Sequence, residues 1–547
     1  MSASFKGHTV VVTGAGGGLG KAYSLLFASR GANVVVNDFN AAAAQKVVDE
    51  IVAVTDLGSL AGGKAVANTS SVSDGAAIIK SAVDAFGTVT ILINNAGILR
   101  DKGFKNMSDK EWDQITEVHL KGAFACTKAA WPLFRKQKFG RVINTASAAG
   151  LYGNFGQANY SAAKMALVAF TKTLAREGAK YNIKSTVIAP MAASAMTETI
   201  MPPEMLANLS PDYVAPFVAA ISHPDGPDAS GKIFEVGAGF IAEVRWERSN
   251  GAIFKTDDSF TPSAVKAKWD EGKLEAAKKL PPNVQASPAV RFDGQTVIIT
   301  GAGAGLGRAY ALMYAKLGAN VVVNDVNANA AGAVVDEIVK AGGKAAAAVC
   351  SVEDAEKIVQ VALEKFGSVH VLIANAGILR DKSFQAMTEQ EWDIVLAVHL
   401  RSVLKYSTAK AGITGLTRTL AIEGKKYNIL ANAIAPSAGT AMTSTIWPQD
   451  MVDAFKVDGD LLIDNESTTG DLFEILGGWA AQTRWQRSGG YGFPTNKPYT
   501  IEDVFAKWSN ITNFDDGRAT NPSSTQEAIQ QLVENFGNKG DAVKAKL

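Results

Sequence analysis

Tyr160 and Lys164 stand four positions apart in a stretch with a helical pattern, and Ser147 precedes Tyr160 by thirteen residues. Side chains at positions i and i+4 share one face of a helix, so the lysine ammonium can lie near the phenol. A free tyrosine has a pKa of about 10, and a cation some ~4–5 Å away at an effective dielectric of ~20 contributes ~3–4 kcal/mol. We therefore predict that Lys164 lowers the pKa of Tyr160 by about two to three units and makes this tyrosine a usable acid and base.

The same spacing recurs at Tyr406 and Lys410. The chain contains 11 tyrosines, so a single Tyr–Lys pair of this kind arises by chance about as often as not. The interpretation depends on the glycine-rich turn, the acidic residue and the serine that accompany the pair in order along the first copy.

A glycine-rich turn occurs twice in the sequence, 287 positions apart. Each turn follows an apolar run typical of a β-strand and leads into a helical pattern, which is the setting of a phosphate-binding turn. Glycines let the backbone approach a pyrophosphate, and the helix N-terminus offers free amide donors. A lone glycine triplet is more often a flexible turn, so the context carries the prediction. The predicted cofactor-binding residues are Gly14, Gly18, Leu19 and Gly20, and Gly301, Gly305, Leu306 and Gly307.

Asp38 and Asp325 each end a Val-Val-Val-Asn run after the glycine turn. An acidic side chain there accepts the ribose 2′-hydroxyl of NAD and repels the 2′-phosphate of NADP, since like charges ~4 Å apart at a dielectric of ~20 cost ~4 kcal/mol. The alternative for Asp38 is a helix N-cap. Asn95 and Asn375 follow the next strand, where they could bond neighbouring strand backbone and line the nicotinamide ribose, or serve as simple turn residues. The predicted cofactor is therefore NAD.

Strand-like runs alternate with helical patterns throughout the first copy. Such alternation predicts an α/β fold with two tandem doubly wound parallel-sheet (Rossmann) domains, whose ligands bind beyond the carboxyl ends of the strands. The expected strands lie near 10–13, 33–37, 64–68, 89–94, 140–146, 184–188 and 231–237.

Composition and charge point to small-molecule chemistry. The formal net charge of +1 and the absence of a long basic run argue against a nucleic-acid surface. Cys126 and Cys350 lie in different repeats, which favours a reducing compartment, and no metal-ligand spacing is present. No apolar run reaches the ~18 residues of a membrane span. The chain stops at Ala545-Lys546-Leu547, a variant of the Ser-Lys-Leu peroxisomal address, so we expect peroxisomal localisation and an import receptor as a partner.

The repeat also sets the expected domain organisation. The offset between the copies falls from 287 to 280, then to 246 and finally to 239, so the second copy is 48 residues shorter. We expect a first dinucleotide-binding domain at 1–240, an extension and linker at 241–290, a second such domain at 291–478, an extension at 479–519 and a solvated tail at 520–547.

The largest step removes from the second copy the counterpart of Gly140–Ser147, a strand that ends in the serine. A parallel sheet buried on both faces cannot skip an interior strand, because its neighbours would carry unpaired backbone groups at ~1–3 kcal/mol each. We therefore expect the protein to contain further residues near 403–406 and 457–470 that are missing from the sequence as written. The serine of the second copy cannot be assigned.

Together these motifs resemble the short-chain dehydrogenase/reductase family, whose pattern runs Thr-Gly-x-x-x-Gly-x-Gly, Asn-Asn-Ala-Gly, Ser and Tyr-x-x-x-Lys. The segments Val118–Gly122, Tyr152–Tyr160 and Phe234–Gly239 are similar to those of one branch of the family, the peroxisomal multifunctional enzymes of type 2. The resemblance covers about 5–240 fully and 292–478 with the gaps described.

The resemblance implies NAD-dependent oxidation of (3R)-hydroxyacyl-CoA to 3-ketoacyl-CoA in peroxisomal fatty-acid β-oxidation, with acyl-CoA substrates as partners. It implies that Tyr160 takes the hydroxyl proton, Ser147 holds the substrate oxygen, and Lys164 lowers the pKa of the tyrosine and bonds the nicotinamide ribose. It implies the same catalytic and cofactor-binding roles for Tyr406 and Lys410 in the second copy. Alternatives are a hydroxysteroid or other secondary-alcohol dehydrogenase, or a nucleotide-binding scaffold with an inactive second copy. Because family members usually dimerise, we expect the two domains to form a pseudo-dimer within one chain. The sequence does not decide whether two chains then form a further homodimer.

Two departures from the family pattern stand out. His119 and His399 replace an asparagine that anchors a proton-relay water in many members, which leaves the relay uncertain. Full-length relatives also carry a hydratase domain, and nothing after residue 520 is long enough to be one, so we expect a dehydrogenase-only or truncated form.

A methionine-rich segment at 191–213 is the expected substrate loop. Methionine side chains supply adaptable apolar surface suited to acyl chains, although ordinary core packing is an equal alternative. Trp447 of the second copy replaces Met201, so the two sites are expected to differ in chain-length preference. The methionines are Met191, Met196, Met201 and Met205.

Overall fold

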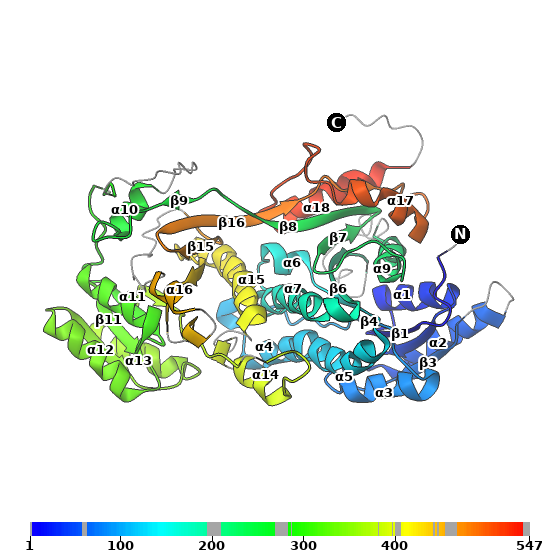
Figure 1. The fold of residues 1–547 in the computed structure, drawn as a ribbon, viewed down its shortest axis with the longest axis horizontal. Helices are drawn as coiled ribbons and strands as arrows, with labels where there is room; N and C mark the ends of the chain where they lie inside the picture. Colours follow the sequence, from blue (N-terminus) through cyan, green and yellow to red (C-terminus); the bar gives the residue numbers. More distant parts are fainter. Residues whose placement is uncertain are drawn as a thin grey trace.

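The computed structural model describes residues 3–56, 63–193, 209–268, 283–285, 287–380, 382–396, 398–399, 406–440, 443–445, 448–454 and 468–539. The first copy lies at the right of Figure 1 and the start of the second copy at the left. Two long strands, β8 (Phe240–Arg248) and β16 (Trp479–Arg487), run between the two sides along the upper edge.

The first copy is a doubly wound α/β unit, and all seven predicted strands are confirmed. Its parallel strands are β1 (Thr9–Thr13), β2 (Asn33–Asn37), β3 (Ala65–Asn68), β4 (Ile91–Asn94), β5 (Gly140–Thr145), β6 (Ile183–Met191) and β7 (Ile233–Gly237). The helices among them are α1 (Gly18–Ser29), α2 (Ala41–Asp56), α3 (Gly75–Phe86), α4 (Asp109–Thr116), α5 (Gly122–Gln137), α6 (Ala148–Tyr152), α7 (Ala158–Gly178) and α9 (Ala215–Ser222).

The strands of this unit follow the order β3-β2-β1-β4-β5-β6-β7, with β8 antiparallel at the end. Val10 pairs with Val34 of β2 and Ile91 of β4, so β1 is central. Every residue of β1 is buried, as expected for a parallel strand covered by helices on both faces. The carboxyl ends of β1, β4 and β5 therefore meet at one edge, where the sequence places its polar motifs.

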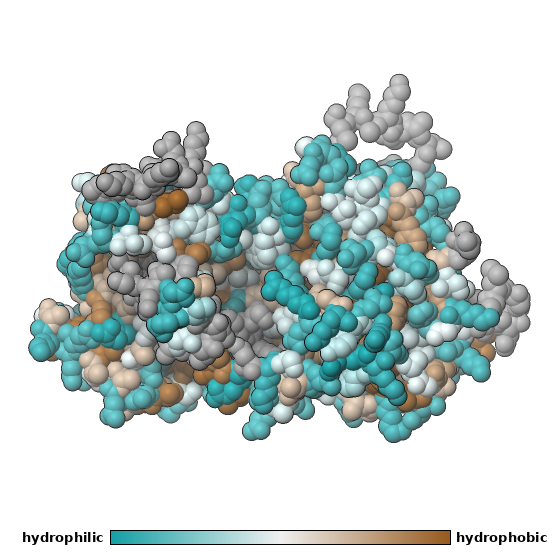
Figure 2. All heavy atoms as spheres, viewed as in Figure 1, coloured by the Kyte–Doolittle hydropathy of each residue, from teal (hydrophilic) through white to brown (hydrophobic). Residues whose placement is uncertain are grey.

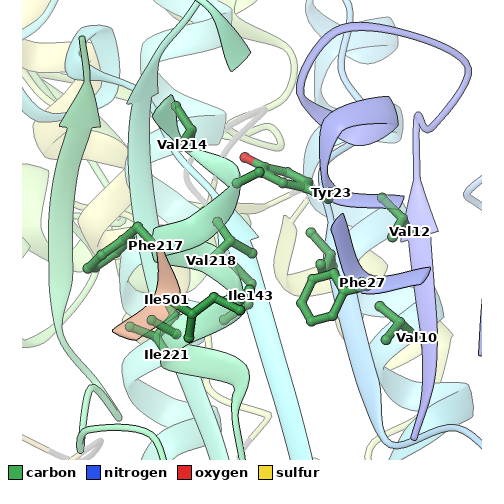
Figure 3. Close-up of a cluster of buried hydrophobic side chains, with 14 of the residues drawn as sticks. Val10, Val12, Tyr23, Phe27, Ile143, Val214, Phe217, Val218, Ile221 and Ile501 are labelled. Atoms are coloured by element: carbon green, nitrogen blue, oxygen red, sulfur yellow. The ribbon is translucent and has the colours of Figure 1, made fainter. Parts of the chain in front are cut away.

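One apolar core joins the sheet to helix α1. Figure 3 shows Tyr23 and Phe27 of α1 beside Val10 and Val12 of β1. Ile501 belongs to the same cluster although it comes from α17 (Ile501–Ile511), more than 200 residues after the first copy ends. The far end of the chain is thus part of the core of the first copy.

The second copy has the same element order at its start. Its strands are β10 (Thr296–Thr300), β11 (Asn320–Asn324), β12 (Lys344–Ala348), β13 (Val371–Ile373), β14 (Ala433–Ser437) and β15 (Leu472–Leu476). Its helices are α11 (Gly305–Lys316), α12 (Ala328–Lys340), α13 (Ala355–Phe366), α14 (Glu389–Leu396), α15 (Tyr406–Gly424) and α16 (Gln449–Ala454). Short elements α10 (Pro262–Ala267), β9 (Ala252–Ile253) and β17 (Tyr491–Gly492) lie in the extensions.

The sheet of the second copy is divided. Strands β12, β11, β10 and β13 form a four-stranded parallel sheet of their own, whereas β14 and β15 continue through β16 into the large sheet of the first copy. Among the described residues, β13 pairs only with β10 and β14 only with β15. The second domain is therefore split where its central strand is missing.

The prediction of further residues near 403–406 and 457–470 is not tested by the fold of the given 547 residues and stays a prediction. Only five residues separate Leu400 from Tyr406, which begins α15. The sheet avoids unpaired interior backbone by separating into two sheets, so that β13 and β14 become edge strands. The loop difference at Val54–Gly62 and the segments around 403 and 457–467 include residues outside those described.

The two copies pack about the pair Trp246 and Trp485. These residues are equivalent in the repeat and sit opposite each other in the antiparallel pairing of β8 with β16. Their rings stack with centroids 3.6 Å apart. Helices α7 and α15, also equivalent, contact closely enough that a Cβ at Gly415 would lie 2.4 Å from the Ser161 carbonyl oxygen. Equivalent surfaces meet, which is the arrangement of an isologous interface within one chain.

The expectation of a solvated tail from residue 520 is wrong for its first part. Helix α18 (Thr525–Glu534) buries Ala528 and Leu532, which lie four residues apart on one face. This short apolar stripe indicates a packed helix, although the overall composition of the segment is polar. In the part of the chain that the structure describes, no helix is both long and apolar enough to cross a membrane.

Candidate active site

Ser147, Tyr160 and Lys164 come together at the carboxyl end of β5. Ser147 is the N-cap of α6, where its hydroxyl accepts a hydrogen bond of 3.2 Å from the Ala149 amide. The Tyr160 side chain hydrogen-bonds with Ser147. The Lys164 ammonium lies 5.4 Å from the centroid of the Tyr160 ring and donates a 2.6 Å hydrogen bond to the Thr145 carbonyl oxygen. The predicted constellation is present.

The pKa of Tyr160 contradicts the sequence-based argument. Burial raises it to about 12, the hydrogen bond with Ser147 lowers it, and the nearby Asp101 carboxylate raises it. Burial also lowers the pKa of Lys164 to about 7. A lysine that is partly neutral at physiological pH cannot supply a full positive charge, and desolvation of the phenolate outweighs what remains. The prediction that Lys164 alone acidifies Tyr160 is wrong for the protein without cofactor.

His119 lies directly against Tyr160. It sits in a π-helical turn, Glu117–Lys121, and its ring meets the tyrosine ring edge-on with centroids 5.2 Å apart. Its Nε2 lies 3.1 Å from the Ile98 amide nitrogen and 2.8 Å from the Ile98 carbonyl oxygen, while Nδ1 is buried with no hydrogen-bond partner among the described residues. Burial lowers the pKa of His119 well below its usual value, so the ring is neutral. A Cβ at Gly97 would lie 2.6 Å from the ring, so this position needs glycine.

A small cavity separates His119 from Lys164. It offers about 10 Å³ to the centre of a water molecule and is lined partly by Thr13, Asn94 and Thr145. This volume is near the minimum for one water, and the lining supplies polar partners. The cavity can therefore hold about one water molecule beside His119 and Lys164.

The first glycine turn has the conformation that a phosphate site requires. Gly14 and Gly18 have φ angles of +63° and +49°, and a Cβ at Gly20 would lie 2.2 Å from the Gly14 carbonyl oxygen. Helix α1 begins at Gly18 without a side-chain cap, and a Cβ at Gly17 would meet nothing within 4 Å. The first-turn amides are thus available to an anion.

Asp38 is positioned by the same turn. Its carboxylate accepts hydrogen bonds of 2.9 Å from the Gly16 and Asn40 amides. Asn40, not Asp38, accepts from the Ala43 amide in the first turn of α2. The alternative of a helix N-cap for Asp38 is therefore wrong, and its half-buried carboxylate lies at the strand end beside the glycine turn.

Asn95 joins two strand ends. Its side-chain amide donates to the carbonyl oxygens of Thr13 at 3.0 Å and Gly14 at 3.1 Å. Its own backbone amide donates to the Thr13 hydroxyl at 3.0 Å. The predicted bond to neighbouring strand backbone is confirmed, and a role at the ribose stays a prediction.

The sequence of the chain matches the model of a known family in both copies. The description of that family is short chain dehydrogenase, and the matched residues are 8–204 and 295–405. The chain belongs to the short chain dehydrogenase family. The family explains why a glycine turn, a serine and a Tyr–Lys helix meet at one sheet edge.

Three relatives place this member of the family more narrowly. The peroxisomal hydratase-dehydrogenase-epimerase of Neurospora crassa is 49% identical over 604 aligned positions, covering 98% of this chain and 66% of that protein. The protein of the same name from Saccharomyces cerevisiae is 43% identical, covering 97% of this chain and 67% of that protein. A short-chain type dehydrogenase/reductase of Mycobacterium tuberculosis is 48% identical over 273 positions, covering 48% of this chain and 93% of that protein.

These alignments carry two further facts. The chain spans about two thirds of the length of the fungal relatives. The Neurospora alignment is longer than the 547 residues of this short chain dehydrogenase, so the relative has residues opposite gaps in this chain.

The nucleotide half of the second copy repeats the first. Gly303 donates from its amide to Asp325 at 3.0 Å, and Asn375 donates from its side chain to the carbonyl oxygens of Thr300 at 3.0 Å and Gly301 at 3.2 Å. Asn327 caps α12, as Asn40 does α2. Gly301 and Gly305 have positive φ angles, Gly307 packs on the Gly301 carbonyl oxygen, and Leu306 packs against the local core.

The catalytic half of the second copy is incomplete. Lys410 lies on α15, where burial lowers its pKa, and His399 lies within 2.6 Å of the Ile378 amide nitrogen and carbonyl oxygen. Tyr406 begins the helix, but its side chain lies outside the described residues, as do Met196, Met201, Met205 and Trp447. Ser402, the serine between His399 and Tyr406 in the given sequence, aligns with Gly122 and not with Ser147, so no residue is assigned as the second serine.

Sequence reasoning missed Asp101. This carboxylate accepts a 2.8 Å hydrogen bond from Gln157 and acts on the pKa of Tyr160. Burial raises the pKa of Asp101 itself. The repeat could have drawn attention to Asp101, because the segment Ile98–Lys102 recurs unchanged at Ile378–Lys382.

Proposed function

We propose that the first copy catalyses the NAD-dependent oxidation of (3R)-hydroxyacyl-CoA to 3-ketoacyl-CoA in peroxisomal fatty-acid β-oxidation. The observation that carries the proposal is the 49% identity, over 98% of this chain, with a protein named peroxisomal hydratase-dehydrogenase-epimerase. The assembled Ser147, Tyr160 and Lys164 supply the groups that such a reaction needs. The proposal is limited to the dehydrogenase step.

The residues of the first copy fit a dinucleotide. The uncapped start of α1 and the open space at Gly17 suit a pyrophosphate, and Asp38 suits a ribose hydroxyl. Repulsion of a 2′-phosphate by the same carboxylate favours NAD over NADP. When bound, oxidised NAD accepts hydride from C3 of the substrate and adds a positive charge to the site.

Tyr160 acts as the base for the substrate 3-hydroxyl after its own phenolic proton has passed to the neutral form of Lys164, and the phenolate so formed takes the substrate proton. The Ser147 hydroxyl, already hydrogen-bonded with Tyr160, holds the same substrate oxygen and orients it toward the phenol. Lys164 is held by its hydrogen bond to the Thr145 carbonyl oxygen. It can accept or donate a proton, since its pKa of about 7 leaves it half protonated near neutrality. The proton taken by Tyr160 can leave through Lys164 and the cavity beside His119.

The second copy, on this proposal, binds nucleotide but does not turn over substrate. Its glycine turn, Asp325 and Asn375 keep the contacts of the first copy. Its lack of a serine removes the group that would hold the substrate oxygen.

The purified chain tests the proposal with NAD and matched (3R)- and (3S)-hydroxyacyl-CoA esters, with formation of NADH as the readout. We expect turnover of the (3R) ester, little turnover of the (3S) ester, and a kcat lowered by about 10²- to 10⁴-fold in Tyr160→Phe. A secondary alcohol of the steroid type serves as the competing substrate. Faster turnover of the steroid, or equal use of both hydroxyacyl isomers, would overturn the assignment.

The peroxisomal part has a separate test. A fluorescent protein fused ahead of the chain should accumulate in peroxisomes, and deletion of Ala545–Leu547, which lies outside the described residues, should leave it in the cytosol. Unchanged import after the deletion would show that this tripeptide is not the address.

A further inference from the structure

The segment Leu151–Gly156 links the two catalytic side chains of the first copy. It includes the last two residues of α6, whose N-cap is Ser147, and the turn before α7, which carries Tyr160. Any shift of this segment moves Ser147 and Tyr160 relative to each other. Its backbone contacts therefore bear on the geometry of the site.

The second copy holds the start of this segment. The Leu151 carbonyl oxygen accepts hydrogen bonds from Arg418 Nη1 at 2.6 Å and from Trp485 Nε1 at 2.7 Å. Leu151 O belongs to the last turn of α6, where helical carbonyl groups lack partners within the helix. A residue of α15 and a residue of β16 thus cap the carboxyl end of α6, the helix whose N-cap is Ser147.

The rest of the segment is held in the same way. The Asn154 amide donates to the Thr419 hydroxyl at 3.3 Å, and the Gly156 amide donates to Glu423 Oε1 at 3.0 Å. The other carboxylate oxygen of Glu423 accepts from the Phe104 amide at 2.7 Å.

Arg418 is built into the interface. Its guanidinium lies 5.3 Å from the ring of Trp246 and 5.8 Å from the ring of Trp485. Gly153, at a φ of +79°, passes so close that a Cβ there would lie 2.8 Å from the Arg418 Cβ. The planar guanidinium suits both the stacking and the directed hydrogen bond.

The second copy holds α6 of the first copy, but the equivalent lysine of the first copy has no such helix to hold in the second. Arg418 corresponds in the repeat to Lys172 of α7, and Glu423 corresponds to Glu177. Glu177 keeps its contact with the Phe384 amide, at 2.7 Å. The counterpart of α6, however, is within the stretch that the second copy lacks, so Lys172 has no such helix to hold.

We propose that the second copy acts as a positioning subunit for the first active site, and that Arg418, with Trp485, fixes the carboxyl end of α6 and thereby the placement of Ser147 against Tyr160. Arg418 is a positioning residue, since it acts through Leu151. The kinetic part of this inference rests on the proposed dehydrogenase function. The structural part, order in Leu151–Gly156, does not.

The kinetic test uses the full chain with Arg418→Ala, Arg418→Lys and Trp485→Phe. The phenylalanine keeps one aromatic ring for the stack and loses the N–H donor together with the second ring of the indole. We expect Arg418→Ala to lower kcat about 10- to 100-fold with KM for NAD changed less than about 2-fold, because misplacement of reacting groups by ~1 Å costs on that order. Arg418→Lys, which retains one donor, should recover part of the loss.

A matched control is Arg484→Ala. Arg484 neighbours Trp485 on β16, is largely exposed and pairs with Glu247 at 2.7 Å without touching α6. It should leave kcat unchanged. Equal loss in Arg484→Ala and Arg418→Ala, or a kcat of Arg418→Ala within about 2-fold of the wild-type chain, would overturn the proposal.

Hydrogen exchange separates this inference from the proposed function. In folded Arg418→Ala with a thermal midpoint near that of the wild-type chain, the amides of Ala149, Asn154 and Gly156 should exchange faster, while those of β1 should not change. If the wild-type chain fails to oxidise any hydroxyacyl-CoA, the proposed function fails and this exchange pattern alone decides the positioning role. Unchanged exchange at these three amides would refute it.

Discussion

Leu92 and Ile183 are almost completely buried in the first copy, whereas their counterparts in the second copy, Leu372 and Ile429, are 64% and 55% exposed. In the first copy these residues pack in one cluster with Trp131 of α5 and other residues of α5 and β5. In the given sequence, no residues of the second copy align with 124–157, which contain most of that helix and the whole strand. Apolar residues, brown in Figure 2, reach the surface around the second copy at the lower left.

The comparison shows which parts of this fold depend on each other. The nucleotide half, from the glycine turn to Asn375, keeps its hydrogen bonds without the central strand, because those bonds join only β10, β11 and β13. The catalytic half needs β5 for its serine. The later strands β14 and β15 remain folded by joining the sheet of the first copy through β16.

The sharpest test of this difference replaces the two tyrosines separately. Tyr160→Phe should lower kcat by about 10²- to 10⁴-fold, the usual contribution of a positioned acid–base group. Tyr406→Phe should leave kcat within about 2-fold, because its copy lacks a serine. Steady-state kinetics with a (3R)-hydroxyacyl-CoA measure both. Substantial activity in Tyr160→Phe that disappears in the double variant would assign turnover to the second copy and contradict the comparison.

Truncation of the paired leucines tests the packing difference. Leu92→Ala should lower the free energy of unfolding by about 2–5 kcal/mol, because it removes buried methyl groups and leaves a cavity. Leu372→Ala should change it by no more than about 0.5 kcal/mol, since the side chain is mostly exposed. Denaturant unfolding followed by circular dichroism gives both values. Equal losses would mean that something covers Leu372 in solution.

Much of this architecture could be predicted from the residues. The buried valine runs at 10–12 and 34–36 identify central strands, and the glycine turns identify the phosphate site, because both depend on local patterns. The Tyr–Lys spacing likewise placed Tyr160 and Lys164 on one helix. Each of these features is set by contacts close in the chain.

The rest depended on contacts between the copies. The split of the second sheet follows from competition between unpaired strand edges, and no local pattern shows that β16 would pair with β8. The pKa of Tyr160 depends on how deeply the folded protein buries it and on Asp101. Arg418 is unremarkable in sequence, and only the fold brings it to Leu151.

Cofactor choice should also differ between the copies. Asp38→Ala should raise kcat/KM with NADP by about 10-fold or more, since removal of a nearby carboxylate relieves repulsion of the 2′-phosphate. Asp325→Ala should alter neither NAD nor NADP kinetics if only the first copy turns over. Initial rates with both cofactors measure the ratio. A shift in cofactor preference from Asp325→Ala would place turnover in the second copy as well.

The smallest expected effect concerns ionisation of Tyr160 without cofactor. With a pKa of about 12, only ~1% of this phenol is ionised at pH 10, whereas a pKa lowered two to three units by Lys164 would make it fully ionised there. The pKa of Tyr160 is not lowered by Lys164 in this pH range, because Lys164 has a pKa of about 7 and is neutral where tyrosines titrate. Tyrosinate absorbance of the wild-type chain minus that of Tyr160→Phe should therefore stay near zero up to pH 10, and Lys164→Met should not change it. A tyrosinate signal that appears below pH 10 and vanishes in Lys164→Met would restore the ammonium as the dominant influence, and a signal that appears only with NAD would assign it to the charge of the cofactor.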